Sequence, residues 1–205
     1  LSFSTSVEGD GDLCRVNINN TGYSFPVING EVEGEVKIDN VHLWNGLEDP
    51  YLYPVSFSLE KNGEERDEIE LKVGFRTIEI DSGKGFFLNG RSYPLRGVSR
   101  HQDRWGKGNA IDERDEDEDM DIILDSGANS MRLAHYQHSQ HFYDLCDEKG
   151  LLVWAEIPFI TVFMENGKEN TLSQMKELVV QNIHHPSIFC WALSNEITLQ
   201  GVTDS

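Results

Sequence analysis

The sequence predicts a multidomain β and α/β protein, in which an antiparallel β-sandwich is followed by the first four strand–helix units of a (β/α)8 barrel. Two observations carry this prediction. Through about residue 81 apolar and polar residues alternate, which is the period of strands that bury one face. After Pro94, short apolar runs alternate with helical patterns, which is the order of a parallel sheet with crossover helices.

The first region is expected to form short strands joined by tight turns, and a sandwich is the natural packing for such strands. We place this domain at residues 1–81 and the second domain at 82–205. A two-residue turn at Asn89-Gly90 predicts a hairpin at the start of the second domain. Clear alternation covers residues 13–18, 32–38 and 55–59, and turns are predicted at Asn19-Asn20, Asn29-Gly30 and Asn62-Gly63.

The second region alternates four predicted strands, at 95–99, 129–133, 151–157 and 188–193, with three predicted helices. Thr171 and Gln174 are expected to form a capping box, and Gly127 and Gly150 to end helices. A doubly wound nucleotide-binding sheet needs a glycine-rich turn after its first strand, and residues 106–108 lack that spacing. The barrel is therefore favoured.

Each predicted barrel strand is followed by polar residues. In a (β/α)8 barrel the carboxyl ends of the strands converge on one face, where such enzymes carry out their chemistry. The sequence therefore predicts a site at that face. The residues expected there are His101, Arg132 with His135, Glu156, and Asn195 with Glu196.

Composition excludes several classes of protein. A net charge of −19 argues against a nucleic-acid partner, because such binding depends on clustered Lys and Arg. The acidic run at 112–121 is interpreted as the solvated start of a helix rather than a metal site. The sequence contains neither a membrane-length apolar stretch nor an export signal, and its three cysteines lack zinc-ligand spacing. We expect no membrane association and a cytoplasmic location.

Asn195-Glu196 is the strongest chemical feature. A carboxylic acid at a barrel mouth suits glycosidic cleavage, because it can protonate the leaving oxygen and later deprotonate the attacking water. The same dipeptide could instead begin a helix, whose amino-terminal end favours a glutamate. The dipeptide alone leaves both interpretations open.

Longer motifs favour the enzyme. The segment Trp191-Ala192-Leu193-Ser194-Asn195-Glu196, with His184-His185-Pro186 before it, resembles the fourth barrel strand of glycoside hydrolase family 2. Within the family the chain looks most like bacterial β-galactosidases, and β-glucuronidases or β-mannosidases remain as alternatives. Further matches occur at residues 44–53, which look like the end of the family's immunoglobulin-like domain, at 73–76, which look like the link into its barrel, and at 88–103, 127–136 and 146–156 in the TIM barrel.

The resemblance implies a retaining, exo-acting hydrolase that removes terminal β-D-galactose from β-galactosides. Glu196 matches the acid/base, and Asn195 matches the amide that binds the sugar 2-hydroxyl. His101, Arg132 and His135 match pocket residues. Asp103 is either a further hydroxyl acceptor or a turn residue, and Glu156 is either a supporting carboxylate or an internal ion-pair partner. Trp105 is either a platform for a sugar face or a loop-packing residue.

The resemblance also carries expectations about what this chain lacks. Some family members hold magnesium just after the third strand, but residues 157–162 here do not support that site, so we predict neither metal nor cofactor. The family's nucleophilic glutamate belongs to a seventh strand, whereas Glu196 lies nine residues before Ser205. We therefore expect the 205-residue chain alone to be inactive, with a non-catalytic carbohydrate-binding fragment as the alternative. The open strand edges of a half-barrel further predict either self-association, with a homo-oligomer as one form, or instability.

Overall fold

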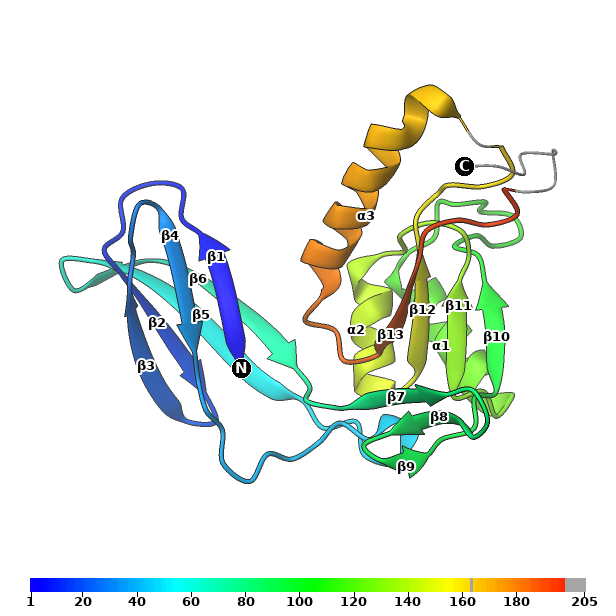
Figure 1. The fold of residues 1–205 in the computed structure, drawn as a ribbon, viewed down its shortest axis with the longest axis horizontal. Coiled ribbons are helices and arrows are strands. Elements are labelled where there is room, and N and C mark those ends of the chain that lie inside the picture. The colour runs from blue at the N-terminus through cyan, green and yellow to red at the C-terminus, as the bar shows by residue number, and fades with distance from the viewer. Residues whose placement is uncertain (163, 198–205) are drawn as a thin grey trace. The chain divides into compact units, whose positions relative to one another are not determined.

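The computed structural model describes residues 1–162 and 164–197 (Figure 1). By packing, the chain divides into two compact units. The first comprises residues 1–42 and 52–75, and the second comprises residues 43–51 and the chain from residue 76 onward. The packing boundary thus lies a few residues before the predicted domain boundary at 81 and 82, which stays a prediction.

The first unit is an immunoglobulin-like β-sandwich. One sheet has the order β3-β2-β5-β6 and the other pairs β1 with β4, all antiparallel. Alternate residues of β2, among them Val16 and Ile18, are buried against Val55 of β5, as the alternating pattern predicted. The strands are β1 (Ser2–Ser6), β2 (Leu13–Ile18), β3 (Thr21–Pro26), β4 (Glu31–Glu35), β5 (Tyr53–Lys61) and β6 (Glu64–Val73).

The predicted two-residue turns are confirmed. Both residues of each turn have positive φ, for example 53° and 80° at Asn62-Gly63 and 51° and 74° at Asn89-Gly90. This geometry matches the twist of the flanking strands in a hairpin, and asparagine and glycine adopt it at the least steric cost.

The second unit contains two sheets. An antiparallel sheet joins β7 (Ile78–Asp81), β8 (Gly85–Leu88) and β9 (Arg91–Ser92). A parallel sheet joins four strands in chain order, as expected for successive units of a barrel: β10 (Gly97–Arg100), β11 (Ser130–Leu133), β12 (Leu152–Glu156) and β13 (Ile188–Ala192). The helices are α1 (Glu113–Asp125), α2 (Gln140–Lys149) and α3 (Lys168–Asn182), with short turns η1 (Gly46–Glu48) and η2 (Glu165–Gly167).

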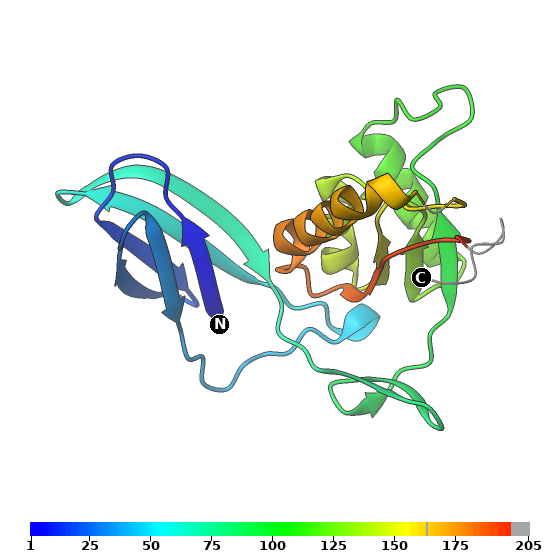
Figure 2. The ribbon, with the colours of Figure 1, turned by 45° about the horizontal axis from the view of Figure 1, so that its top comes forward.

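The helices cover one face of the parallel sheet (Figure 2). Outward-facing Leu133 and Ala155 are buried there against Phe142 of α2 and Leu178 of α3. On the other face, Ser99, Arg132 and Trp154 occupy one register row, and they line an open hollow of about 520 Å³. The described chain is therefore a partial barrel with a packed outer layer and an open inner face.

The predicted helices are confirmed, with two corrections at their starts. The acidic run does begin α1, and Asp112 and Asp115 form a capping box, but Asp115 and Glu116 are buried rather than solvated. Burial is stable because Arg104 and Lys107 neutralise Asp115. The capping box predicted at Thr171 is wrong, because α3 already begins at Lys168 and the Thr171 hydroxyl donates to the Gly167 carbonyl.

Residues 43–51 precede the rest of the second unit in sequence and pack against it. Trp44 is fully buried, and its indole nitrogen donates to the Asp147 carbonyl over 2.8 Å. Asn89 donates to the Trp44 carbonyl over 3.0 Å. Beneath them, a Cβ at Gly150 would lie 2.2 Å from the Gly46 carbonyl oxygen. Residues 43–51 therefore pack against the carboxyl end of α2 so closely that only glycine fits.

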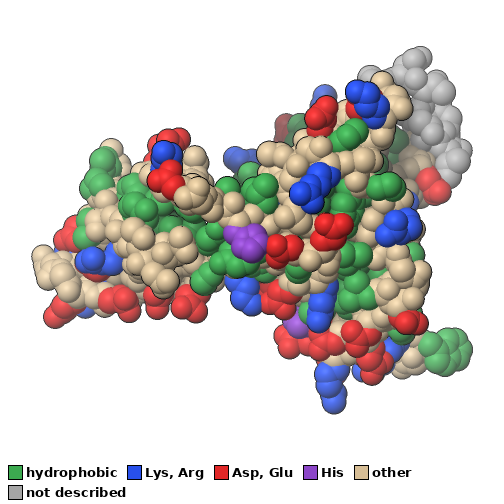
Figure 3. Space-filling view, turned by 90° about the horizontal axis from the view of Figure 1, so that it is seen from below, with side chains coloured by type: hydrophobic (Ala, Val, Ile, Leu, Met, Phe, Trp, Pro, Cys, Tyr) green, Lys and Arg blue, Asp and Glu red, His purple; other side chains and the backbone are tan. Residues whose placement is uncertain are grey.

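The surface is strongly acidic, and Figure 3 shows aspartate and glutamate side chains over both units among fewer lysines and arginines. None of the helices in the described part of the chain has the length and apolar character needed to span a bilayer.

We expect Gly150→Ala to destabilise the second unit strongly, because the new methyl group would overlap the Gly46 backbone. Gly150 and Gly127 both have φ of +81°, but nothing lies within 4 Å of a Cβ built at Gly127. Gly127→Ala is thus the matched control, with a cost of about 1–2 kcal/mol for the left-handed backbone alone. Overlap should add roughly 1–3 kcal/mol at Gly150. Urea denaturation measures both, and equal losses would contradict the close contact.

Candidate active site

Three strand ends bring four of the predicted residues together. Arg132 near the end of β11 donates to Glu156 at the end of β12 through both Nε and an NH2 group, the latter over 3.2 Å. His135 Nδ1 lies 2.9 Å from Glu156 Oε2, and Arg132 donates to Asn195 Oδ1 over 2.6 Å. We call Arg132, His135, Glu156 and Asn195 the mouth cluster.

Glu156 is the electrostatic centre of the mouth cluster. Its residue exposure is only 1%, so its carboxylate has lost nearly all contact with water. A buried carboxylate costs several kcal/mol unless it is paired and hydrogen-bonded. Arg132 supplies the opposite charge and His135 a further hydrogen bond. The ion pair foreseen as one interpretation of Glu156 is therefore present, and it fixes the guanidinium group.

The contacts also determine what the free atoms can do. His135 Nδ1 lies 2.9 Å from Glu156 Oε2 and 3.2 Å from an Arg132 NH2 group. We assign the ring proton to Nδ1, because the carboxylate is the nearer partner and can only accept, and Nε2 of the neutral ring is then an acceptor. A guanidinium only donates, so the oxygen of the Asn195 amide faces Arg132 and its NH2 group remains a donor. The mouth cluster thus offers one acceptor and one donor for sugar hydroxyls.

The other predicted residues do not share the hydrogen bonds of this cluster in the described chain, and His101 alone among them has a ring contact with it. The His101 ring packs edge-on to His135 with centroids 5.1 Å apart, and Asp103 is exposed. Trp105 is 100% exposed, so it does not act as a packing residue in the described chain. Glu196 is exposed and has φ of 56°. Its carboxylate forms neither a hydrogen bond nor an ion pair with the residues that the structure describes.

The position of Asn195 is set by the loop after β12. Its backbone N–H donates to the Phe159 carbonyl over 2.9 Å, and its carbonyl accepts from Thr161 N–H over 3.0 Å. This short parallel pairing extends the sheet contact past the end of β13. Glu196, the candidate acid/base, therefore directly follows a residue whose backbone is held by two hydrogen bonds.

Sequence reasoning missed a second layer behind the mouth. Arg100 is buried, donates to Asp119 of α1 over 2.7 Å and contacts His138 Nδ1 at 3.0 Å. Burial lowers the pKa of His138 to about 3, so this ring is neutral. The peptide bond between Ala134 and His135 in the same loop is cis. The adjacency of Arg100 to the predicted pocket residue His101 was the one available signal.

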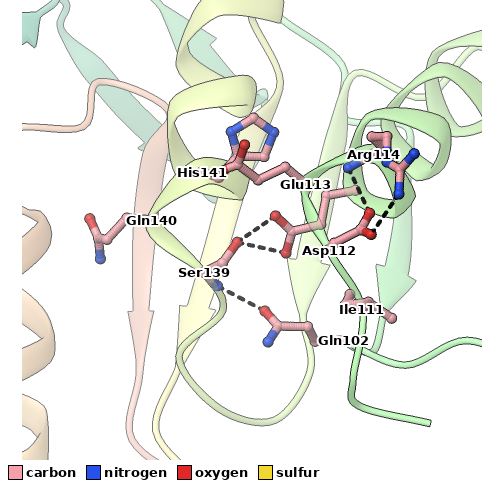
Figure 4. A pocket seen from close by; sticks show the side chains of 9 residues that line it. Gln102, Ile111, Asp112, Glu113, Arg114, Ser139, Gln140 and His141 are labelled. Atoms are coloured by element: carbon pink, nitrogen blue, oxygen red, sulfur yellow. Dashed lines mark hydrogen bonds and ion pairs between the residues drawn. The ribbon is translucent and has the colours of Figure 1, made fainter. Parts of the chain in front are cut away.

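An acidic cleft of about 690 Å³ lies between the amino-terminal ends of α1 and α2 (Figure 4). Ser139 donates its hydroxyl to both Glu116 oxygens, over 2.6 and 2.7 Å, and its N–H to Gln102 over 2.8 Å. These bonds tie the loop before α2 to α1 and to the loop after β10. None of the mouth-cluster residues lines this cleft.

A group with metal-ligand residue types lies at the other end of β13. Asp144, Asp147 and His185 bring three ligand atoms within 4.8 Å of one another. Each oxygen of Asp147 already accepts a hydrogen bond, one from His185 Nδ1 over 2.6 Å and one from Ser187 N–H over 3.0 Å. These buried hydrogen bonds hold the start of β13 to α2.

Two models of a known protein family match nearly the whole sequence of the chain. The model described as glycosyl hydrolases family 2, TIM barrel domain, matches residues 78–203, and that described as glycosyl hydrolases family 2 matches residues 6–76. The chain belongs to glycosyl hydrolase family 2. The predicted family and its two domain types are thereby confirmed.

Relatives carry two different activity names. A β-glucuronidase of Bacteroides fragilis is 43% identical over 78% of this chain and 24% of its own length. A β-galactosidase of Thermoanaerobacter pseudethanolicus is 39% identical over 94% of this chain and 28% of its own length. The crystal structure of a putative β-galactosidase from Bacteroides fragilis is 40% identical, with a TM-score of 0.86 over 92% of this chain and 30% of that chain. The chain spans about a quarter of the length of the curated relatives it matches.

We expect Glu156→Gln to destabilise the second unit, because the glutamine leaves the Arg132 charge without its partner. Breaking a fully buried pair costs about 3–5 kcal/mol, and the 35% exposure of the Arg132 side chain should reduce this to roughly 1–3 kcal/mol. Glu60→Gln, which breaks the exposed pair with Arg15, is the control and should change stability little. Denaturant midpoints compare the two, and an unchanged midpoint for Glu156→Gln would refute the pairing requirement.

His138 should make stability depend on pH in the acidic range. Its pKa is about 3 when folded and 6.5 when unfolded, so the unfolded chain binds the proton first. Its contribution is complete above pH 6.5 and falls as the pH drops toward 3, by at most about 1.4 kcal/mol per pH unit. Arg100 and His101 face the ring and reinforce this direction. The stability gap between wild type and His138→Gln should therefore shrink between about pH 7.5 and about pH 5 in denaturant titrations; a constant gap would contradict it.

Proposed function

We propose that the protein carrying this chain is a retaining, exo-acting glycosidase that removes terminal β-D-galactose from β-galactosides. The observation that carries the proposal is the position of Glu196, exposed directly after the anchored Asn195 and beside the mouth cluster, in a member of this family. The β-galactosidase relative that matches 94% of the chain supports galactose as the sugar.

Glu196 acts as general acid and base in this proposal. Its carboxylic acid protonates the glycosidic oxygen as the bond to the anomeric carbon breaks, and its carboxylate then takes a proton from the attacking water. The exposed Glu196 carboxyl suits both tasks because it is accessible to a substrate and to water, and none of the described residues holds its oxygens. The positive φ of Glu196 turns the backbone immediately after Asn195.

The mouth cluster binds the sugar. Arg132 leaves the Asn195 NH2 group free to donate to the 2-hydroxyl, a contact that strengthens as positive charge develops at the sugar ring. His135 Nε2 accepts from a neighbouring hydroxyl, while His101 beside it and exposed Asp103 extend the pocket. Glu156 supports these groups by holding Arg132 and His135 in place.

A retaining mechanism needs a second carboxylate about 5–5.5 Å from the first. Glu156 is unsuited to that role, since both of its oxygens are occupied by Arg132 and His135. We propose that the nucleophile comes from chain outside these 205 residues and that the 205-residue polypeptide alone hydrolyses nothing. The carbohydrate is then the partner of the complete barrel rather than of this part.

β-Glucuronide hydrolysis is the second candidate. It is favoured by the β-glucuronidase that is 43% identical over 78% of the chain. Both candidates use the same acid/base and the same 2-hydroxyl contact, and the two sugars differ in the configuration of the 4-hydroxyl and in the group on C5. Parallel assays with nitrophenyl β-galactoside and nitrophenyl β-glucuronide decide between them.

We expect Glu196→Gln in the complete protein to lower kcat/KM for nitrophenyl β-galactoside about 10²–10⁴-fold, the usual contribution of a general acid/base. Dinitrophenolate leaves without protonation, so the variant should keep the bond-breaking step with a dinitrophenyl galactoside. Azide should restore turnover, because it replaces the activated water as the nucleophile of the second step. Glu148→Gln, on the exposed side of α2, is the matched control with wild-type rates. An equal loss with both leaving groups would remove Glu196 from the acid/base role, and hydrolysis by the 205-residue polypeptide would refute its predicted inactivity.

A further inference from the structure

The loop from Ala134 to Ser139 lies between the mouth cluster and a buried cation. Arg100, with a side chain only 5% exposed, donates through Nε and NH2 to Asp119 Oδ2 over 3.0 and 2.7 Å. Its guanidinium carbon lies 3.9 Å from the centre of the Phe142 ring. Asp119 belongs to α1 and Phe142 to α2, so both helices hold the Arg100 guanidinium in place beside the loop.

The remaining NH1 group of Arg100 determines the state of His138. NH1 can only donate, so His138 Nδ1, 3.0 Å away, must accept and cannot carry a proton. The neutral ring then carries its proton on Nε2, which lies 3.3 Å from the Ala134 carbonyl oxygen. The low pKa of His138 agrees with this neutral ring. The contacts therefore define the His138 tautomer and the order of donation. Arg100 donates to His138 Nδ1, and His138 Nε2 donates to the Ala134 carbonyl.

Ala134 is held on both sides of its backbone. Its N–H donates to the Arg100 carbonyl over 2.9 Å, and its carbonyl accepts from His138. The next residue is His135, whose ring contacts Glu156 and Arg132 in the mouth cluster. Ala134 is itself buried and presents no group to a substrate. Any displacement of its carbonyl would therefore move the peptide that carries His135.

We propose that His138 is a positioning residue for the glycosidase site: its Nε2–H bond to the Ala134 carbonyl fixes the backbone that directs the His135 ring toward the sugar. This inference rests on the proposed function, because His135 matters for catalysis only if the mouth binds a substrate. His138 touches no substrate and acts through His135 alone.

Two substitutions separate positioning from packing. Glutamine can place its amide nitrogen near the position of Nε2 and donate to Ala134, but it leaves Arg100 NH1 without its acceptor. Asparagine can place its oxygen near the position of Nδ1 and accept from Arg100, but it is too short to reach Ala134. Each variant therefore keeps one of the two bonds. Phe142→Leu loosens the same buried layer through the ring contacts of Phe142 with Arg100 and His138, and it removes none of the polar groups that form the two His138 bonds.

The kinetic test uses the complete protein with the nitrophenyl glycoside that it hydrolyses. We expect His138→Asn to lower kcat/KM roughly 10–100-fold, mainly in kcat, since misplacement of a group by about 1 Å can cost that much. His138→Gln should restore most of this loss, and Phe142→Leu should lower the melting temperature with rates close to wild type. Equal activity of the asparagine and glutamine variants would overturn the proposal, as would a loss that follows melting temperature across all three.

A spectroscopic test is independent of catalysis. Nitrogen-15 NMR of the histidine rings in the 205-residue chain should show His138 protonated at Nε2 and His135 protonated at Nδ1 near neutral pH. His138→Asn should shift the His135 ring signals, and His138→Gln should leave them near their wild-type positions. Protonation of His138 at Nδ1, or unmoved His135 signals in the asparagine variant, would refute the inference. If wild type hydrolyses neither glycoside, the proposed function fails and these spectra still decide the role of His138.

Discussion

The buried charge of Glu156 is the constraint on which the arrangement of the mouth depends. A carboxylate with 1% exposure must be neutralised by neighbours, because water no longer stabilises it. Arg132 and His135 meet this requirement, and in doing so each loses its freedom to rotate. The guanidinium so fixed then orients the Asn195 amide. One buried charge thus links the ends of β11 and β12 to Asn195, which lies just beyond β13, and Glu196 is the next residue.

The same logic operates on both faces of the sheet. Along β10 and β11 successive side chains alternate between the inner and outer faces, so Arg132 points toward the mouth while Arg100 points into the layer beneath the helices. Each arginine contacts a histidine of the intervening loop. The carboxylate beside Arg132 leaves His135 protonated at Nδ1, whereas Arg100 leaves His138 protonated at Nε2. A fixed carboxylate and a fixed cation therefore set tautomers of opposite sense within one short loop.

Much of the fold and part of the site follow from sequence alone, because they depend on local patterns. Alternation places β2 and β5, and Asn89-Gly90 specifies its turn, without reference to distant residues. The four mouth-cluster residues were identifiable because each lies at the carboxyl end of an apolar strand or shortly after it. Contacts across long separations were not, since Trp44 and Asp147 are 103 residues apart and no local period links them. The buried state of Asp115 depends likewise on Arg104 and Lys107 from a loop with no regular pattern.

The irregularity in β13 shows why strand position alone does not define the site. Val153 pairs with Ile188 but Trp154 pairs with Cys190, so Phe189 is an extra residue in β13. Such a bulge reverses the facing of every later residue relative to an unbroken strand. Ile188 and Trp191 both pack toward the outer core, which an unbroken two-residue period would forbid. Ala192 consequently lies opposite Glu156 in the inward-facing row. Arg76 fixes the start of the same strand through the Pro186 and Ile188 carbonyls, at 2.8 and 2.5 Å. Arg76 holds the start of this strand, and the pairing at Asn195 anchors the chain beyond its end, so the register set by one inserted residue is fixed on both sides up to the candidate acid/base.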